Sequence, residues 1–263
     1  MLKLSIITIN YNNAQGLQKT LESVDSQTFV DYEQIIIDGG SIDGSVEIIK
    51  NYESIIKNYC WASEPDNGVY HAQNKGIEKA NGEYCLFLNS GDYFCNEKVL
   101  ETIFSKNSDA DIIWGNLIVI NARESKIGIC KGNEHVTFLD IYSSIIKHQA
   151  SFIKRGLFKK YGLYDESLKI VADWAFFFKT AGFNEVSLHY VDIDIAYFKA
   201  DGISYNNPQL CRIERQKVLD QYMPRIMQED YLLFQKYRNV RYIDKRKTGF
   251  FLFKILAKIF KSI

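Results

Sequence analysis

The sequence predicts an α/β protein built on a mostly parallel central sheet flanked by helices. Apolar runs typical of buried strands alternate with amphipathic helical runs over about the first ninety residues. Loops rich in Gly, Asn and Asp separate these runs. The chain has 263 residues, 46% apolar and 24% charged. This composition is typical of one large globular domain or two small ones, and it excludes a disordered chain or a coiled coil.

The alternation places four strands and three helices in order. We expect strands at 2–9, 34–37, 59–62 and 84–88, and helices at 14–26, 45–56 and 72–80. On the first helix, Leu17, Leu21 and Val24 share one face, which predicts that this face packs on the sheet. Asn81-Gly82 is expected to cap the third helix. Strand–helix–strand units at this spacing favour parallel strands joined by right-handed crossovers.

After Asp92 the alternation weakens. A helix at 99–104 and a strand at 111–121 are expected, with a polar stretch behind them. The predicted domains are a catalytic domain at 1–205, with halves at about 1–95 and 96–205, and a helical C-terminal extension at 206–263.

Polar residues follow the strands of the first half at their carboxyl ends. They are Tyr11, Asp38, Ser63-Glu64 and Asn89 to Asp92. Asp and Gly after a strand are also ordinary turn formers, so one such loop would indicate little. Four loops at one edge of an open α/β sheet are better explained by a ligand site.

Composition narrows the classes of function. No run of 18 apolar residues occurs, and the N-terminus leads directly into a strand, so we expect neither a transmembrane helix nor a signal peptide. Five irregularly spaced cysteines favour reduced thiols in the cytoplasm. No G-x-G-x-x-G follows the first strand, where Asn10-Tyr11-Asn12-Asn13 stands, and this argues against a nicotinamide dehydrogenase.

The net charge of zero conceals an asymmetry. Residues 236–263 hold nine Lys or Arg and one acid, or +8, and residues 1–235 hold 23 bases and 31 acids, or −8. A localised basic tail favours one anionic partner over nucleic acid. At about 248–263, lysines on one face of an apolar helix favour a helix lying on an anionic membrane surface. The alternative is a helix docked on the protein's own core.

Short motifs in a fixed order connect the sequence to a known family. They lie at 5–12, 37–45, 63–70, 74–76, 82–84, 87–92, 148–149 and 172–174. Together they resemble the family 2 glycosyltransferases of bacterial polysaccharide and O-antigen synthesis, which have the Rossmann-like GT-A fold. The last fifty or so residues carry no such motif.

The resemblance implies binding of a nucleoside diphosphate-sugar. It places Tyr11 beside the base or ribose, Asp38 as acceptor of a base N–H, and Lys75 near the nucleotide. The other residues that it assigns to the nucleotide-sugar are Thr8, Asn10, Asp66, Asn89, Ser90 and Gly91.

The family binds Mg²⁺ or Mn²⁺ with two acids separated by one residue. Here Asn89, Ser90 and Gly91 stand where acids are common, which leaves Asp92 as the metal ligand. One carboxylate with phosphate oxygens and water can still hold Mg²⁺, so we expect metal dependence. His71 also departs from the family pattern, and it is either a contact to a ligand or a surface histidine.

Asp173 matches the catalytic base of the family. The residues alone leave a helix N-cap as an equal interpretation, and the resemblance favours the base. Burial against Trp174 is expected to raise its pKa. His148, Gln149 and Trp174 are expected on the acceptor or diphosphate side of the cleft.

The sequence therefore predicts an inverting glycosyltransferase that moves one sugar to a lipid-linked saccharide acceptor in surface polysaccharide synthesis. Such an enzyme would be cytoplasmic and peripheral on the inner face of the cell membrane. The reduced motif at Asn89 to Asp92 motivates the alternative, a non-catalytic nucleotide-sugar or glycan-binding protein on a degenerate transferase fold.

Overall fold

The computed structural model describes residues 2–121, 123–200 and 202–237, and the chain divides into two compact units, Met1–Arg215 and Gln216–Ile263. The basic tail predicted at 248–263 lies outside the described residues. No helix in the described ranges combines the length and the hydropathy needed to cross a bilayer.

The first half of the larger unit alternates strands and helices as predicted. Its elements are β1 (Leu4–Asn10), α1 (Ala14–Asp25), β2 (Tyr32–Asp38), α2 (Ser45–Tyr52), β3 (Tyr59–Ser63), α3 (Val69–Lys79) and β4 (Tyr84–Phe87). Leu17, Leu21 and Val24 are fully buried, which confirms the inward face of α1. Leu17 and Leu21 pack with Ile36 of β2 and Ile49 of α2 in one core cluster.

The second half is less regular. Its elements are β5 (Tyr93–Phe94), α4 (Val99–Ser105), β6 (Ile112–Ile120), β7 (Lys126–Cys130), α5 (Phe138–Tyr142), the 3₁₀ helix η1 (His148–Ala150), β8 (Ser151–Lys154), α6 (Arg155–Tyr161), α7 (Ala172–Phe183), β9 (Leu188–Lys199) and α8 (Ile203–Asn206). Two helices follow, α9 (Pro208–Tyr222) and α10 (Arg225–Tyr237).

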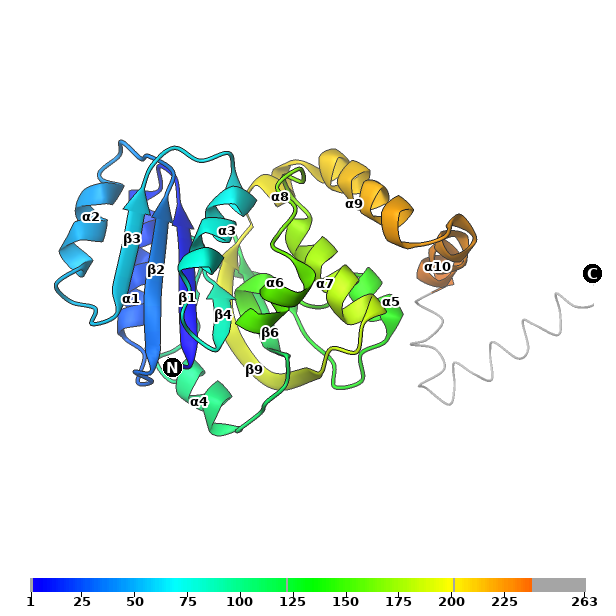
Figure 1. The fold of residues 1–263 in the computed structure, drawn as a ribbon, viewed down its shortest axis with the longest axis horizontal. Coiled ribbons are helices and arrows are strands. Elements are labelled where there is room, and N and C mark those ends of the chain that lie inside the picture. Colours follow the sequence, from blue (N-terminus) through cyan, green and yellow to red (C-terminus); the bar gives the residue numbers. More distant parts are fainter. Residues whose placement is uncertain (1, 122, 201, 238–263) are drawn as a thin grey trace, which may run out of the picture. The chain divides into compact units, whose positions relative to one another are not determined.

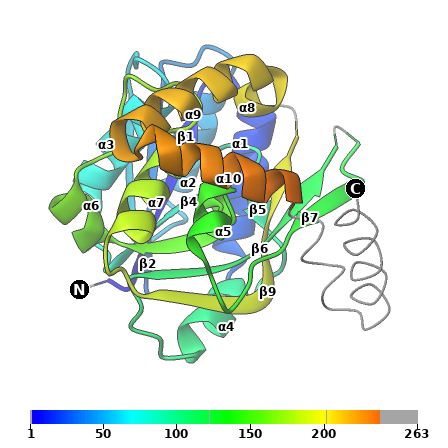
Figure 2. The ribbon, with the colours of Figure 1, turned by 90° about the vertical axis from the view of Figure 1, so that its right-hand side faces the viewer.

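One nine-stranded sheet runs through the larger unit in the order β3-β2-β1-β4-β8-β6-β9-β5, with β7 paired to β6 as a hairpin (Figure 2). The strands β3, β2, β1 and β4 are parallel. Beyond β4 the sheet is mixed, because β8 runs antiparallel to both of its neighbours. Antiparallel neighbours need no crossover helix, which is why the strand–helix alternation in the sequence weakens after Asp92.

Gly82 differs from its expected role. The helix α3 ends at Lys79 with Ala80 as its C-cap, so Gly82 does not cap it. Instead, a Cβ on Gly82 would lie 2.5 Å from the backbone nitrogen of Ser5. The glycine is therefore required by close packing of the chain against β1, and not by helix termination.

The strand order reverses between β1 and β4. The chain passes from β1 outward through β2 to β3 and then returns through α3 to place β4 on the other side of β1. Figure 1 shows α3 in front of these strands and α1 behind them. In open α/β sheets the carboxyl ends of the strands at such a reversal form a crevice that binds ligands.

Candidate active site

The loops after β1, β2, β3 and β4 are tied together at the carboxyl edge of the sheet (Figure 1). Backbone hydrogen bonds continue past the strand ends, from Gly39 to Asn10, from Glu64 to Asp38 and from Ser90 to Ile9, at 2.8 to 3.0 Å. The convergence of four polar loops that the sequence predicts is present in the structure.

Asp38 is fully buried, and its carboxylate is already surrounded by donors. It accepts five hydrogen bonds, from Asn10 Nδ2, Ser63 Oγ, the Gly40 N–H and both the N–H and Oγ of Ser41. Burial acts to raise the pKa of Asp38, but these bonds outweigh it and the pKa is lowered. Asp38 therefore organises the loops, and the expectation that it accepts a base N–H does not fit this geometry.

Tyr11 and Asp66 meet beside Gly39. A Cβ on Gly39 would lie 2.8 Å from Asp66 Oδ2 and 3.1 Å from Tyr11 Cδ2, so only glycine leaves room for both side chains. The Tyr11 side chain is 65% exposed. Asp66 Oδ1 accepts from the Gly68 N–H at 2.8 Å. The pair thus offers an open aromatic ring beside a carboxylate oxygen, which suits a planar heterocycle with an N–H donor.

The loop from Asn89 to Asp92 is fastened to α1 and α3. Thr20 Oγ1 donates to the Asp92 carbonyl at 2.7 Å and accepts from the Gly91 N–H at 2.9 Å. Gln73 Nε2 donates to Asn89 Oδ1 at 3.2 Å. Asp92 is buried, and within the described ranges no three His, Cys, Asp or Glu side chains are grouped to hold a metal ion. The protein alone therefore does not enclose a cation here.

Asp173 lies in the first turn of α7 and holds two polar partners from distant segments. Its Oδ2 is 2.7 Å from His148 Nδ1, and its Oδ1 is 3.0 Å from the Tyr70 hydroxyl. That hydroxyl also donates to the Ile170 carbonyl at 2.6 Å. The N-cap of α7 is Val171, so the interpretation of Asp173 as the N-cap is wrong.

The pKa of Asp173 is lowered, in contrast to the rise that its burial suggested. Burial does act to raise this pKa, but the electrostatic interaction with His148 and the hydrogen bonds from His148, the Trp174 N–H and Tyr70 outweigh it. The carboxyl group is therefore ionised throughout the neutral pH range. About a fifth of its side chain remains exposed, at 21%.

The remaining candidate residues differ in their surroundings. Lys75 binds Glu64 at 2.8 Å on the same edge of the sheet. Gln149 is buried next to His148 in η1. The Trp174 indole N–H donates to the Ile141 carbonyl at 3.2 Å, and its ring stacks on Phe178. Trp174 is thus part of the packing between α7 and α5, and His71 accepts from the Asn67 N–H as a loop contact.

Three buried oxygens at this edge have no hydrogen-bond partner among the described residues. They are Thr8 Oγ1, Asn10 Oδ1 and Gln73 Oε1. Buried polar atoms are nearly always paired, so water or a ligand is expected to complete the bonding of each of these oxygens.

Sequence reasoning missed two residues, Tyr70, which binds Asp173, and Glu214, which binds the segment before it. Tyr70 lies in a recognised motif, four residues after Asp66, so its motif could have flagged it. Glu214 binds the backbone just before α7 and lies outside all motifs, so no sequence signal pointed to it.

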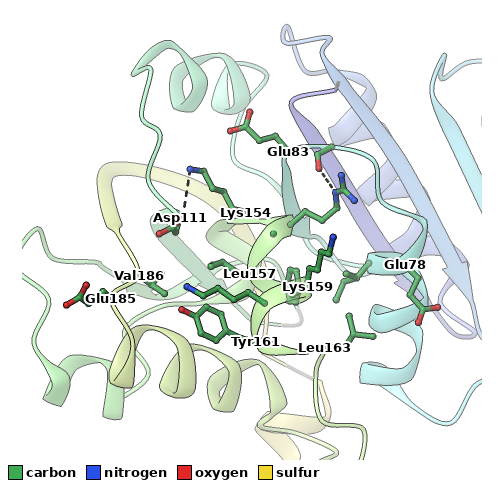
Figure 3. Close-up of a pocket in the computed structure, with 16 residues that line it drawn as sticks. Glu78, Glu83, Asp111, Lys154, Leu157, Lys159, Tyr161, Leu163, Glu185 and Val186 are labelled. Carbon is green, nitrogen blue, oxygen red and sulfur yellow. Dashed lines mark hydrogen bonds and ion pairs between the residues drawn. The ribbon is translucent and has the colours of Figure 1, made fainter.

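A hollow of about 780 Å³ lies elsewhere on the larger unit. Figure 3 shows its lining, which includes Glu83, Asp111, Lys154 and Lys159. Glu83 and Asp111 directly precede β4 and β6, so this hollow is at the amino ends of those strands. The convergent polar groups lie at the carboxyl edge instead, and they mark the candidate site.

Comparison with known sequences gives a family. Residues 5–168 match the family described as Glycosyl transferase family 2. An uncharacterized glycosyltransferase of Mycobacterium tuberculosis is 33% identical over 187 residues, which are 68% of each chain. A PGL/p-HBAD biosynthesis glycosyltransferase of Mycobacterium bovis is 27% identical over 202 residues, 75% of this chain and 77% of that one.

Solved structures share the fold. Residues 1–349 of S. aureus TarS superpose with a TM-score of 0.66 at 21% identity, over 88% of this chain and 69% of that chain. The same TarS fragment in complex with UDP-GlcNAc has a TM-score of 0.63 at 23% identity, over 75% and 58%. A Pyrobaculum calidifontis mannosyltransferase in complex with GDP-Man and Mn²⁺ has a TM-score of 0.58 at 14% identity, over 81% and 61%. The predicted GT-A fold, with helices flanking a central sheet, is confirmed.

The bonding of Asp38 predicts a pH-dependent contribution to stability. Asp38→Ala should lower the free energy of unfolding at pH 7 by about 3 kcal/mol or more, because several buried donors lose their acceptor. The pKa of Asp38 is lowered in the folded state, so this contribution is complete above the unfolded pKa of about 3.9 and is lost as pH falls through the folded value. Urea denaturation at pH 7 and pH 3 measures both effects.

The exposed Asp31 supplies the control, since its side chain lies outside this network. Asp31→Ala should change stability by less than about 0.5 kcal/mol. If Asp38→Ala costs no more than Asp31→Ala, Asp38 is not the organising group.

Proposed function

The chain belongs to glycosyl transferase family 2, and on that premise we propose that it moves one sugar, with inversion, from a nucleoside diphosphate-sugar to a lipid-linked saccharide acceptor. One observation carries the proposal: the carboxylate of Asp173, whose pKa is lowered, is held by His148 and Tyr70 at the edge where the four loops converge. Tyr70 lies in the first turn of α3, four residues after Asp66, so the carboxylate lies close to the nucleotide loops.

We propose that Tyr11 and Asp66 bind the nucleoside. The exposed Tyr11 ring stacks on the base, and Asp66 Oδ2 accepts the base N–H in place of Asp38. Thr8 and Asn10 lie just before Tyr11 at the end of β1, and water or the bound nucleotide-sugar completes the hydrogen bonding of their unpaired oxygens. Lys75, already beside Glu64, supplies positive charge near the nucleotide. The TarS complex with UDP-GlcNAc, a protein of the same fold, supports a nucleotide-sugar donor.

The protein offers only a few ligands to a divalent cation at this site. The donor set has one carboxylate, Asp92, with the amide oxygen of Asn89 and the hydroxyl of Ser90 in the same loop. Mg²⁺ commonly binds through one or two carboxylates, water and substrate phosphates, so Asp92 would hold the ion together with the donor diphosphate. Such an ion, Mg²⁺ or Mn²⁺, would offset the charge that develops on the leaving diphosphate.

In the proposed reaction the acceptor hydroxyl oxygen bonds to the anomeric carbon as the bond from that carbon to the diphosphate breaks. The hydroxyl proton passes to Asp173, and the nucleoside diphosphate leaves from the opposite face. An acceptor oxygen becomes strongly acidic as its new bond forms, so a carboxylate of low pKa is a sufficient base late in the step. Asp173 Oδ1 shares the Tyr70 hydroxyl with a carbonyl, which makes it the less strongly held oxygen and the one that takes the proton. His148 and Gln149 border the acceptor side.

The alternative is a nucleotide-sugar or glycan-binding protein that does not turn over its ligand. The replacement of acids at Asn89, Ser90 and Gly91 favours it. The network around Asp173 favours the enzyme, because simple binding of a donor needs no ionised carboxylate with a buried histidine partner. Turnover of a panel of nucleotide sugars, measured beside their binding, separates the two.

The base assignment predicts the effect of Asp173→Asn. Transfer should fall by about 10² to 10⁴-fold, because the amide cannot take the acceptor proton. Donor affinity should stay within about twofold, because Asp173 lies outside the proposed nucleoside contacts. Donor binding and single-turnover transfer, measured on the same preparation, test this. Equal losses of donor affinity and rate would instead indicate a structural role, and a normal rate would remove Asp173 from the mechanism.

The metal assignment predicts that Asp92→Ala weakens donor binding about tenfold or more in Mg²⁺ or Mn²⁺ and has little effect in chelator. Titration of the donor into both proteins, with and without chelator, measures this. The control is Asn89→Ala, which should weaken metal-supported binding less because its oxygen is neutral. Full transfer by the unaltered protein in chelator would reject a metal requirement.

We also propose that the protein works at the inner face of the cell membrane, where a lipid-linked acceptor is located. The basic, apolar sequence at 248–263 would bind anionic lipid, with about 1 kcal/mol from each lysine or arginine near the surface. The protein should therefore cosediment with anionic vesicles, and salt should weaken the binding. Deletion of residues 248–263 should abolish it while donor binding persists. Equal cosedimentation of the truncated and full chains would exclude the tail as anchor.

A further inference from the structure

The segment that leads into α7 is held by a carboxylate from α9. Glu214 accepts from the N–H groups of Lys169, Ile170 and Val171 at 2.7, 2.9 and 3.3 Å. Glu214 is 6% exposed, so these three bonds replace nearly all of its contact with water. Val171 is the N-cap of α7 and its side chain makes no capping bond, and Glu214 accepts from the N–H of this N-cap residue and of the two residues before it.

The charge of Glu214 suits this position. The amino end of a helix carries partial positive charge, and bonds from N–H groups to a carboxylate are among the stronger hydrogen bonds in proteins. Since α7 begins at Ala172, the anion lies directly before the turn that carries Asp173. A neutral residue at 214 would leave several buried N–H groups without an acceptor of equal strength.

Arg215, the residue after Glu214, contacts Trp174, the residue after Asp173. The Arg215 guanidinium lies 3.8 Å from the centre of the Trp174 ring and donates to the Tyr142 carbonyl. The same segment is also held through its carbonyl, because Ile170 accepts from the Tyr70 hydroxyl at 2.6 Å. The backbone before Asp173 and the ring after it are thus both fastened by adjacent residues of α9.

From these contacts we infer that Glu214 is a positioning residue for Asp173, and that the proposed transferase site extends through α9 to Arg215. The inference rests on the proposed function of Asp173. Glu214 acts by fixing the backbone at 169–171, which sets the place from which the Asp173 carboxylate meets His148, Tyr70 and the acceptor. Displacement of a catalytic group by about 1 Å can cost about 10²-fold in rate, so this anchor should affect catalysis more than donor binding.

The experiment compares Glu214→Gln and Glu214→Ala with Glu229→Gln, the same chemical change at an exposed glutamate of α10. Gln keeps one acceptor oxygen, so kcat should fall about tenfold for Gln and about 10²-fold for Ala, with KM for the donor within about twofold. Hydrogen exchange at the amides of 169–171 should accelerate in the same order. Glu229→Gln should change neither quantity.

Two results would overturn the inference. One is a wild-type kcat in a variant whose amides at 169–171 exchange rapidly, because the anchor would then be irrelevant to catalysis. The other is a loss of kcat in both variants that is matched by loss of donor affinity and of melting temperature, because the role would then be merely structural. If the unaltered protein transfers no sugar from any donor, the proposed function fails, and slow exchange at 169–171 that depends on Glu214 still tests the anchor by itself.

Discussion

A carboxylate removed from water has to be surrounded by hydrogen-bond donors, and this constraint shapes the carboxyl edge of the sheet. Asp38 gathers donors from the ends of β1, β2 and β3. Glu214 gathers three backbone N–H groups before α7. Asp173 binds a histidine and a tyrosine from segments 25 and 103 residues away in sequence. Each anion fixes one part of the site, and together they join pieces of chain that are far apart in sequence.

The three carboxylates differ in what they leave available. Asp38 is fully buried with both oxygens occupied, so it can only support its neighbours. Glu214 is similarly enclosed. Asp173 keeps part of its side chain in contact with solvent, and its Oδ1 shares a single hydroxyl hydrogen with a carbonyl. Partial access to solvent therefore distinguishes Asp173, which can accept a proton, from the two carboxylates that only hold the fold.

The sequence predicted the part of the fold that depends on local pattern. Each strand of the parallel half, and the loop after it, has its own hydrophobic run and its own turn residues, so β1 through β4 could be read from periodicity. In the mixed half, the helix expected at 99–104 and the strand expected at 111–121 are present as α4 and β6. The short strands β5, with two residues, and β8, with four, could not be read from the sequence, because their partners are set by the curl of the sheet. The roles of the aspartates also could not be predicted without the three-dimensional structure. Asp38 ends a strand and Asp173 begins a helix. Only their hydrogen-bond donors show that the oxygens of Asp38 are fully occupied and that Asp173 can still accept a proton.

The central claim is that His148 keeps Asp173 ionised as the base of a sugar transfer. The pH dependence of kcat/KM for the unaltered protein, His148→Asn and His148→Ala tests it most directly, since the Asn amide can still donate near the position of Nδ1. We expect the acidic limb of the His148→Ala profile to move to higher pH, because burial of Asp173 would no longer be offset, and that of His148→Asn to move less. Coincident acidic limbs in the three proteins would contradict the claim.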